Sequence, residues 1–179
     1  MRNIRKLLGY AIAFAVLASG VVFAQATATH NVNMSVNAFS RLGVTVPGTP
    51  VTLVLLDPGT AGAIPADAVD STNKYLQYSA VTNGTAQKIT VGMGVADVLL
   101  TGTTLSVVSG ATGTTNRGTP AVAVLVSSTA HDLITAIQSC ATGVGGAMGP
   151  ALTFTLSVSD VELLNSTSAA IVTLTYTIL

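Results

Sequence analysis

Apolar and polar residues alternate along most of this chain, which is the pattern of β-strands with one buried face. In the segment 26–39 the even positions are mostly apolar, and the odd positions up to Asn37 are all polar. The segment 169–179 likewise sets apolar side chains against threonines. Many short strands separated by turns predict an all-β fold, a single β-sandwich of the jelly-roll or immunoglobulin-like type.

Between these two segments the same pattern predicts further strands and a long loop. Residues 57–73 have proline and glycine punctuation without a sustained period, so they are expected to form a surface loop. Asn83 and Gly84 separate two alternating runs, which is the strongest local signal for a β-hairpin. The strands are expected at 41–46, 50–56, 74–82, 86–95, 96–102, 103–110, 151–164 and, with both faces buried, 121–128.

One segment departs from the β pattern. Its apolar residues Leu133, Ile134 and Ile137 recur at helical spacing and are followed by Cys140 or Ala141. Thr129 is a suitable N-cap, and Gly143 can end a helix. The sequence therefore predicts a single short helix near 130–141.

The first residues have the order of a secretory signal peptide. Arg2, Arg5 and Lys6 precede an apolar run from 7 to 18, and small residues follow it. The apolar run is shorter than the roughly 20 residues of a membrane-spanning helix, so cleavage and no stable membrane insertion are expected. The predicted organisation is a signal peptide at 1–24, an N-terminal extension at 25–39 and a β-sandwich domain at 40–179, with the exact cleavage site left open.

The chain carries few charges. Only 8% of its residues are Asp, Glu, Lys or Arg, where soluble domains usually have about a quarter, although 49% are hydrophobic, which argues against disorder. Loss of the leader leaves four basic residues against seven acidic ones, a net charge of −3. Four scattered cations form no basic patch, so nucleic acid is not expected as a partner. The single cysteine, Cys140, excludes an internal disulfide and is expected to be a small buried residue.

No set of residues indicates a catalysed reaction or a cofactor, so we expect no enzyme activity. His30 lies in the alternating segment, and His131 stands beside Asp132, but adjacency in sequence does not build a catalytic triad. Weak candidates for calcium ligands share one loop, whose spacing matches no EF-hand: Asp57, Asp67, Asp70 and Asn73. Three triplets match the glycosylation acceptor pattern, at Asn33, Asn83 and Asn165.

The alternating segment 26–38, the body rich in Thr, Gly, Ala and Val, and the final "IVTLTYTIL" resemble secreted β-sandwich subunits of surface fibres, such as fimbrial subunits and spore-coat-U-like proteins. In fimbrial subunits of that class, an N-terminal extension completes the sheet of the next subunit. The resemblance implies that alternate side chains of the extension enter a neighbouring copy: Ala28, His30, Val32, Met34, Val36 and Ala38. Many such subunits have a cysteine pair, where this chain has Cys140 alone.

These observations favour a structural subunit of an extracellular filament, pilus or coat that polymerises with copies of itself. An assembly chaperone is left open. The alternative is a monomeric secreted or periplasmic binding module for calcium or glycan. Less favoured are an outer-membrane barrel, because five aromatic residues after the leader are too few for two aromatic girdles, and a type IV pilin-like subunit, which "RKLLGYAIAF" resembles at its leader. Whether 26–39 pairs within its own subunit or with a neighbour is left open.

Overall fold

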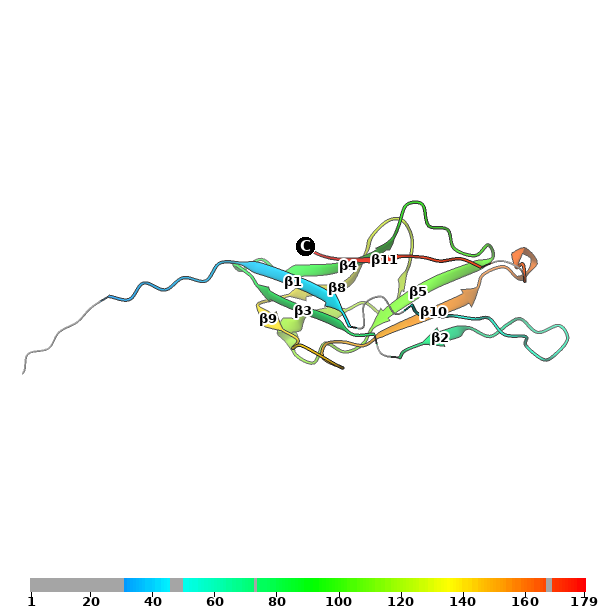
Figure 1. Cartoon of the computed structure of the whole chain (residues 1–179), viewed down its shortest axis with the longest axis horizontal. Coiled ribbons are helices and arrows are strands. Elements are labelled where there is room, and N and C mark those ends of the chain that lie inside the picture. Colours follow the sequence, from blue (N-terminus) through cyan, green and yellow to red (C-terminus); the bar gives the residue numbers. More distant parts are fainter. Residues whose placement is uncertain (1–30, 46–49, 73, 167–168) are drawn as a thin grey trace, which may run out of the picture. The chain divides into compact units, whose positions relative to one another are not determined.

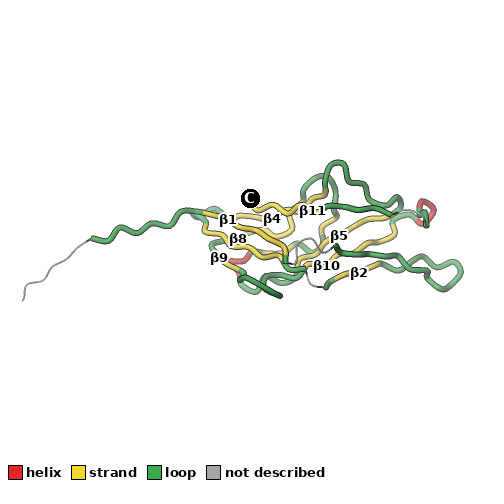
Figure 2. Tube along the Cα trace, in the orientation of Figure 1, coloured by secondary structure: helices red, strands yellow, loops and turns green. Residues whose placement is uncertain are grey.

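A computed structural model describes residues 31–45, 50–72, 74–166 and 169–179 (Figures 1 and 2). The chain divides into two units, Met1–Ser35 and Val36–Leu179. The predicted signal peptide lies outside the described residues. In the second unit the described elements are strands and two short 3₁₀ turns, η1 (Thr115–Arg117) and η2 (Val161–Leu163), so the all-β prediction is confirmed.

The strands form three antiparallel sheets. Their orders are β1-β3-β9, β2-β10-β5-β7 and β11-β4-β8-β6. In chain order the strands are β1 (Phe39–Val44), β2 (Ala68–Asp70), β3 (Leu76–Val81), β4 (Gln87–Met93), β5 (Thr103–Ser109), β6 (Thr119–Pro120), β7 (Val124–Leu125), β8 (His131–Ile137), β9 (Cys140–Ala141), β10 (Leu152–Val158) and β11 (Leu174–Ile178).

The first two sheets meet where β3 and β10 begin. Tyr75 forms an antiparallel bridge with Ala151, and the Leu76 N–H donates to the Pro150 carbonyl at 2.9 Å. Figure 1 shows β3 and β10 following one another along the long axis of this unit. The backbone hydrogen bonds therefore continue from one sheet into the next.

All three sheets contribute to one hydrophobic core. The alternating strands β3, β5 and β10 turn every second side chain inward, as the period of two requires. The largest fully buried apolar side chains are Leu76, Ile89, Val91, Val107, Leu133, Ile134, Ile137 and Leu152. Full burial of each stabilises the fold by about 1.5–3 kcal/mol, so this cluster is the main source of stability.

The helix predicted near 130–141 is wrong, because that segment forms β8 and β9. Two register shifts give β8 more residues than β4: Ile89 pairs with Ile134, the next residue Thr90 pairs with Asp132, and Gln87 pairs with Ile137. A bulge lets neighbouring residues face the same side, and Leu133 and Ile134 are both buried. The resulting spacing of buried residues imitates that of a helix.

Further predictions fail because pairing is decided by the tertiary structure: residues 96–102 form no strand, and the predicted loop 57–73 contains β2. The Asn83–Gly84 turn joins β3 and β4, but these strands belong to different sheets and form no hairpin. Residues 50–56 alternate between half-buried and exposed, yet have no ladder partner among the described residues. The segment 121–128 contains only the short β7, and Leu125 is exposed, so one face is open to solvent.

Ala136 lies in the second bulge of β8 and has a φ of 57°, a left-handed conformation that costs an L-residue about 1–2 kcal/mol. We expect Ala136→Gly to raise the free energy of unfolding by about 0.5–1 kcal/mol in urea titration. As a control, Ala141→Gly in β9, where φ is negative, should lower it by about 0.5–1 kcal/mol. Equal losses for both variants would contradict the bulge geometry.

Candidate functional site

The described part of the N-terminal extension exposes its apolar side chains. Residues 31–38 form no strand, and β1 begins only at Phe39. Val32 is 65% exposed, Met34 89% and Val36 78%, and Ala38 is also exposed. Ala28 and His30 lie outside the described residues. Three large apolar side chains on alternate positions are therefore available to a partner.

The strand that follows, β1, lies at the edge of its sheet. It pairs with β3 from Phe39 opposite Val81 to Val44 opposite Leu76, and with no other described strand. Leu42 and Val44 are half-buried and pack against the core. One row of backbone N–H and C=O groups on β1 therefore has no ladder partner.

The strand β11 is the edge of another sheet. It pairs with β4, from Leu174 opposite Met93 to Ile178 opposite Ile89. Leu174, Tyr176 and Ile178 are half-buried, whereas Thr175 and Thr177 are exposed. The alternation predicted for the last segment is thus confirmed from 174 to 178, and the outer edge of β11 has no described ladder partner.

The two unpaired edges are neighbours, because β1 and β11 lie close together without a ladder between them. Figure 1 shows the C-terminus above β1. We call the line between the strands the β1/β11 seam, lined by Leu42, Val44, Leu174, Tyr176 and Ile178. All five side chains are half-buried rather than buried, so the core is incompletely covered along this seam.

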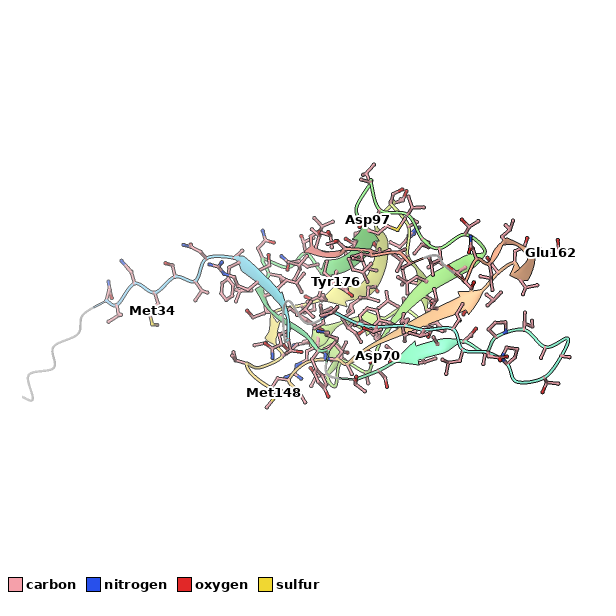
Figure 3. The ribbon with its side chains drawn as sticks, turned by 45° about the vertical axis from the view of Figure 1, so that its right-hand side comes forward. Met34, Asp70, Asp97, Met148, Glu162 and Tyr176 are labelled. Carbon is pink, nitrogen blue, oxygen red and sulfur yellow. The ribbon has the colours of Figure 1, made fainter. Side chains whose placement is uncertain are left out.

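Tyr176 is the polar member of the seam (Figure 3). Its hydroxyl oxygen is buried and has no hydrogen-bond partner. Burial raises the pKa of Tyr176, and no neighbouring charge contributes to that shift. By contrast, the hydroxyl of Tyr78, the other core tyrosine, donates to the Arg117 carbonyl. A buried hydroxyl without a partner costs free energy, which makes Tyr176 an exception that needs an explanation.

Asp97 fixes the start of β11 (Figure 3). Its Oδ2 accepts a hydrogen bond from the Thr173 N–H at 2.7 Å, and the Gly94 N–H donates to the Thr173 carbonyl at 3.3 Å. In a continued β4/β11 ladder the Thr173 N–H would donate to a backbone carbonyl. The Asp97 carboxylate takes the place of that carbonyl as the acceptor. Upstream, Val172 is half-buried like the inward residues of β11, so the same face continues beyond the strand.

The histidines do not form a triad among the described residues. His131 Nε2 lies 3.1 Å from Ser127 Oγ, so the structure brings these two together. Asp132 instead binds Lys88 Nζ at 2.8 Å, since neighbouring residues of a strand point to opposite faces. His30 lies outside the described residues. The sequence neighbours His131 and Asp132 therefore take different partners.

Two of the weak calcium candidates, Asp57 and Asp70, accept hydrogen bonds within local turns. Asp57 Oδ1 accepts from the Gly59 N–H at 2.9 Å, and Asp70 Oδ1 accepts from the Thr72 N–H at 2.7 Å and the Thr72 hydroxyl at 2.8 Å. Asp57 and Asp67 line one cavity of about 580 Å³. Asn73 lies outside the described residues, within which no three His, Cys, Asp or Glu side chains group to hold a metal. Turn chemistry explains the hydrogen bonds of Asp57 and Asp70.

The remaining sequence candidates lie at the surface or beside the core. Asn33, Asn83 and Asn165 are exposed. Cys140 is half-buried and packs against the core, and burial raises the pKa of its thiol. Among the described residues, no helix has the length and apolar character needed to cross a membrane.

No protein-family model, curated protein or solved structure matches this chain.

The two core tyrosines provide a matched test of the seam. Tyr176→Phe removes a buried hydroxyl without a partner, so we expect the monomeric subunit to gain up to about 1 kcal/mol in urea unfolding. Tyr78→Phe removes a hydroxyl that donates to a carbonyl, so we expect a loss of about 1 kcal/mol. If Tyr176→Phe destabilises the subunit as much as Tyr78→Phe, the seam hydroxyl has a partner and its role below is wrong.

Proposed function

We propose that this protein is an exported, non-enzymatic structural subunit that polymerises into a surface filament, pilus or coat. Residues 26–38 of one copy enter the β1/β11 seam of the next copy as a strand. In this proposal, residues 40–179 form a single β-sandwich that a neighbour completes. The observation that carries it is the adjacency of two unpaired edge strands whose inward side chains leave the core half-covered.

A strand inserted at the seam would satisfy both edges. It would offer N–H and C=O groups to β1 on one side and to β11 on the other, where neither has a described ladder partner. Its inward side chains would cover the half-buried residues of the seam. Because a shift by one residue turns the polar face inward, the alternation in 26–38 would also set the register.

The extension has the length and composition for this role. As a strand, residues 26–38 would span about 43 Å, and the run 169–178, which ends in β11, about 33 Å. Val32, Met34 and Val36 are largely exposed, and burial of each would contribute about 1.5–3 kcal/mol. No Lys, Arg or Pro within 26–38 opposes strand pairing.

Two features of the sequence support export and assembly rather than catalysis. The basic, apolar and small-residue order of the leader indicates secretion, which would place the polymer outside the cell. The low charge of the surface gives weak repulsion between copies, as suits a homopolymer. The partner is thus another copy of the same chain.

Deletion of residues 25–38 should leave a folded, soluble subunit that no longer polymerises, because the inserted strand is lost while the core is retained. The assembly state is measured by electron microscopy and by native mass compared with the mass under denaturing conditions. Filaments from the deletion variant would refute strand insertion by this segment.

Paired substitutions on the two faces of the extension provide the control. Val32→Ser with Val36→Ser removes buried area from the inserted face and should abolish filaments. Asn33→Ser with Asn37→Ser changes the opposite face by the same number of residues and should preserve them. Equal effects of both pairs would show that the alternation of the segment is irrelevant to assembly.

A further inference from the structure

We propose that the inserted strand runs antiparallel to β11, with His30 of one copy hydrogen-bonded to the Tyr176 hydroxyl of the next, and that this pair sets a head-to-tail register. The inference rests on the proposed function and concerns the orientation and alignment of the two copies. It begins from the one buried oxygen of the seam that has no hydrogen-bond partner.

The inward face of the extension has a single polar member. Its other alternate positions are Ala28, Val32, Met34, Val36 and Ala38, all apolar. Neutral imidazole can accept a hydrogen bond from a tyrosine hydroxyl through one ring nitrogen. One polar group on the inserted strand therefore matches one polar group in the seam, and a shift by two residues would bury each against an apolar partner.

Antiparallel alignment on this pair matches three of the remaining inward positions. Directly opposite residues of neighbouring strands share a face, so the inward donor residues meet the inward residues of the run that ends in β11. The resulting pairs with inward residues are Ala28 with Ile178, Val32 with Leu174, and Met34 with Val172, whereas Val36 lies opposite Ala170, which is exposed and precedes β11. Parallel alignment on the same pair would place Val32 opposite Ile178 and carry Met34 and Val36 past the end of β11.

The ends of the fold decide which orientation can propagate. Phe39 pairs with Val81 and Ile178 pairs with Ile89, and only the turn 82–86 separates β3 from β4. Phe39 and Ile178 therefore lie at the same end, and Figure 1 shows η2, which precedes the run 169–178, at the opposite end.

An antiparallel strand leaves its neighbour beyond Ala170, at the η2 end. Its own fold, which begins at Phe39, then meets that end, and repetition gives an open filament. A parallel strand would leave past Ile178 and bring two Phe39 ends together. Such a contact between like ends is the arrangement that closes into a dimer.

The inserted strand must also open the seam. The Tyr176 oxygen is inaccessible in the isolated subunit, so an imidazole reaches it only when the side chains that cover it move aside. β1 and β11 share no ladder, so their separation breaks no strand-to-strand backbone hydrogen bonds between them. The seam thus has the property required of an interface that admits a strand.

Disulfide trapping tests the register. In a Cys140→Ala parent, the variant Val32→Cys with Leu174→Cys places two thiols directly opposite each other in the antiparallel register, at a spacing a disulfide can bridge. We expect a ladder of linked subunits on a non-reducing denaturing gel. The matched variant Val32→Cys with Ile178→Cys places them about 13 Å apart along the strand and should give no ladder.

The outcomes separate the two proposals. A ladder from the Ile178→Cys variant alone would mean parallel insertion and overturn the register. No ladder from either variant, with filaments still present, would also overturn the register and leave the proposed function standing. A wild-type protein that forms no filaments would overturn the proposed function itself.

A double-mutant cycle tests the polar pair. We expect His30→Ala and Tyr176→Phe each to raise the dissociation constant of the assembled form about 2- to 12-fold, the range for one hydrogen bond. Combining them should add little to either alone. Independent effects that multiply would contradict a direct contact between the two side chains.

Discussion

Backbone hydrogen bonding at sheet edges is the constraint on which this structure depends. Every strand presents N–H and C=O groups on both sides, and an edge strand satisfies only one side through the sheet. β1 and β11 are both edges, and they are also neighbours. The inward side chains of both strands pack on the core but are only half-buried. The core is therefore incompletely covered along the same line on which the backbone groups lack ladder partners. A strand from another copy would complete both.

The surrounding residues hold β11 in position but provide no ladder partner for its outer edge. The Asp97 carboxylate fixes Thr173 at the start of β11 through its side chain, and so ends the β4/β11 ladder there. The inner edge of β11 is hydrogen-bonded to β4, whose Ile89 and Val91 are fully buried, whatever lies on its outer edge. The two strands thus lie in contact without a ladder between them, and Tyr176 contributes a buried hydroxyl that has no hydrogen-bond partner.

The sequence predicts those elements whose burial alternates regularly. β5, β10 and β11 each have one inward face, and their alternation alone reveals them. It misleads for β8, because two bulges against β4 make Leu133, Ile134 and Ile137 recur at helical spacing. It also misleads at Asn83–Gly84, where the turn is local but the pairing of β3 and β4 with other strands is not.

For the site, the sequence identifies the extension but not the surface that would receive it. Val32, Met34 and Val36 stand on alternate positions of one segment, so their shared face is a local property. The seam lies between β1 and β11, which most of the chain separates in sequence. The approach of two such distant segments leaves no pattern in the sequence of either one. For the same reason, the sequence alone indicates only that Tyr176 occupies one of the inward positions of an alternating strand. The structure shows that its hydroxyl has no hydrogen-bond partner.

Amide hydrogen exchange tests strand insertion at the β1/β11 seam most directly. Exchange is compared between the assembled protein and the monomeric subunit, residue by residue. The amides of 31–38 should exchange freely in the monomer and become protected on assembly, together with the outer-edge amides of β1 and β11. Assembled protein in which residues 31–38 still exchange at the unprotected rate would contradict insertion of this segment into a neighbouring copy.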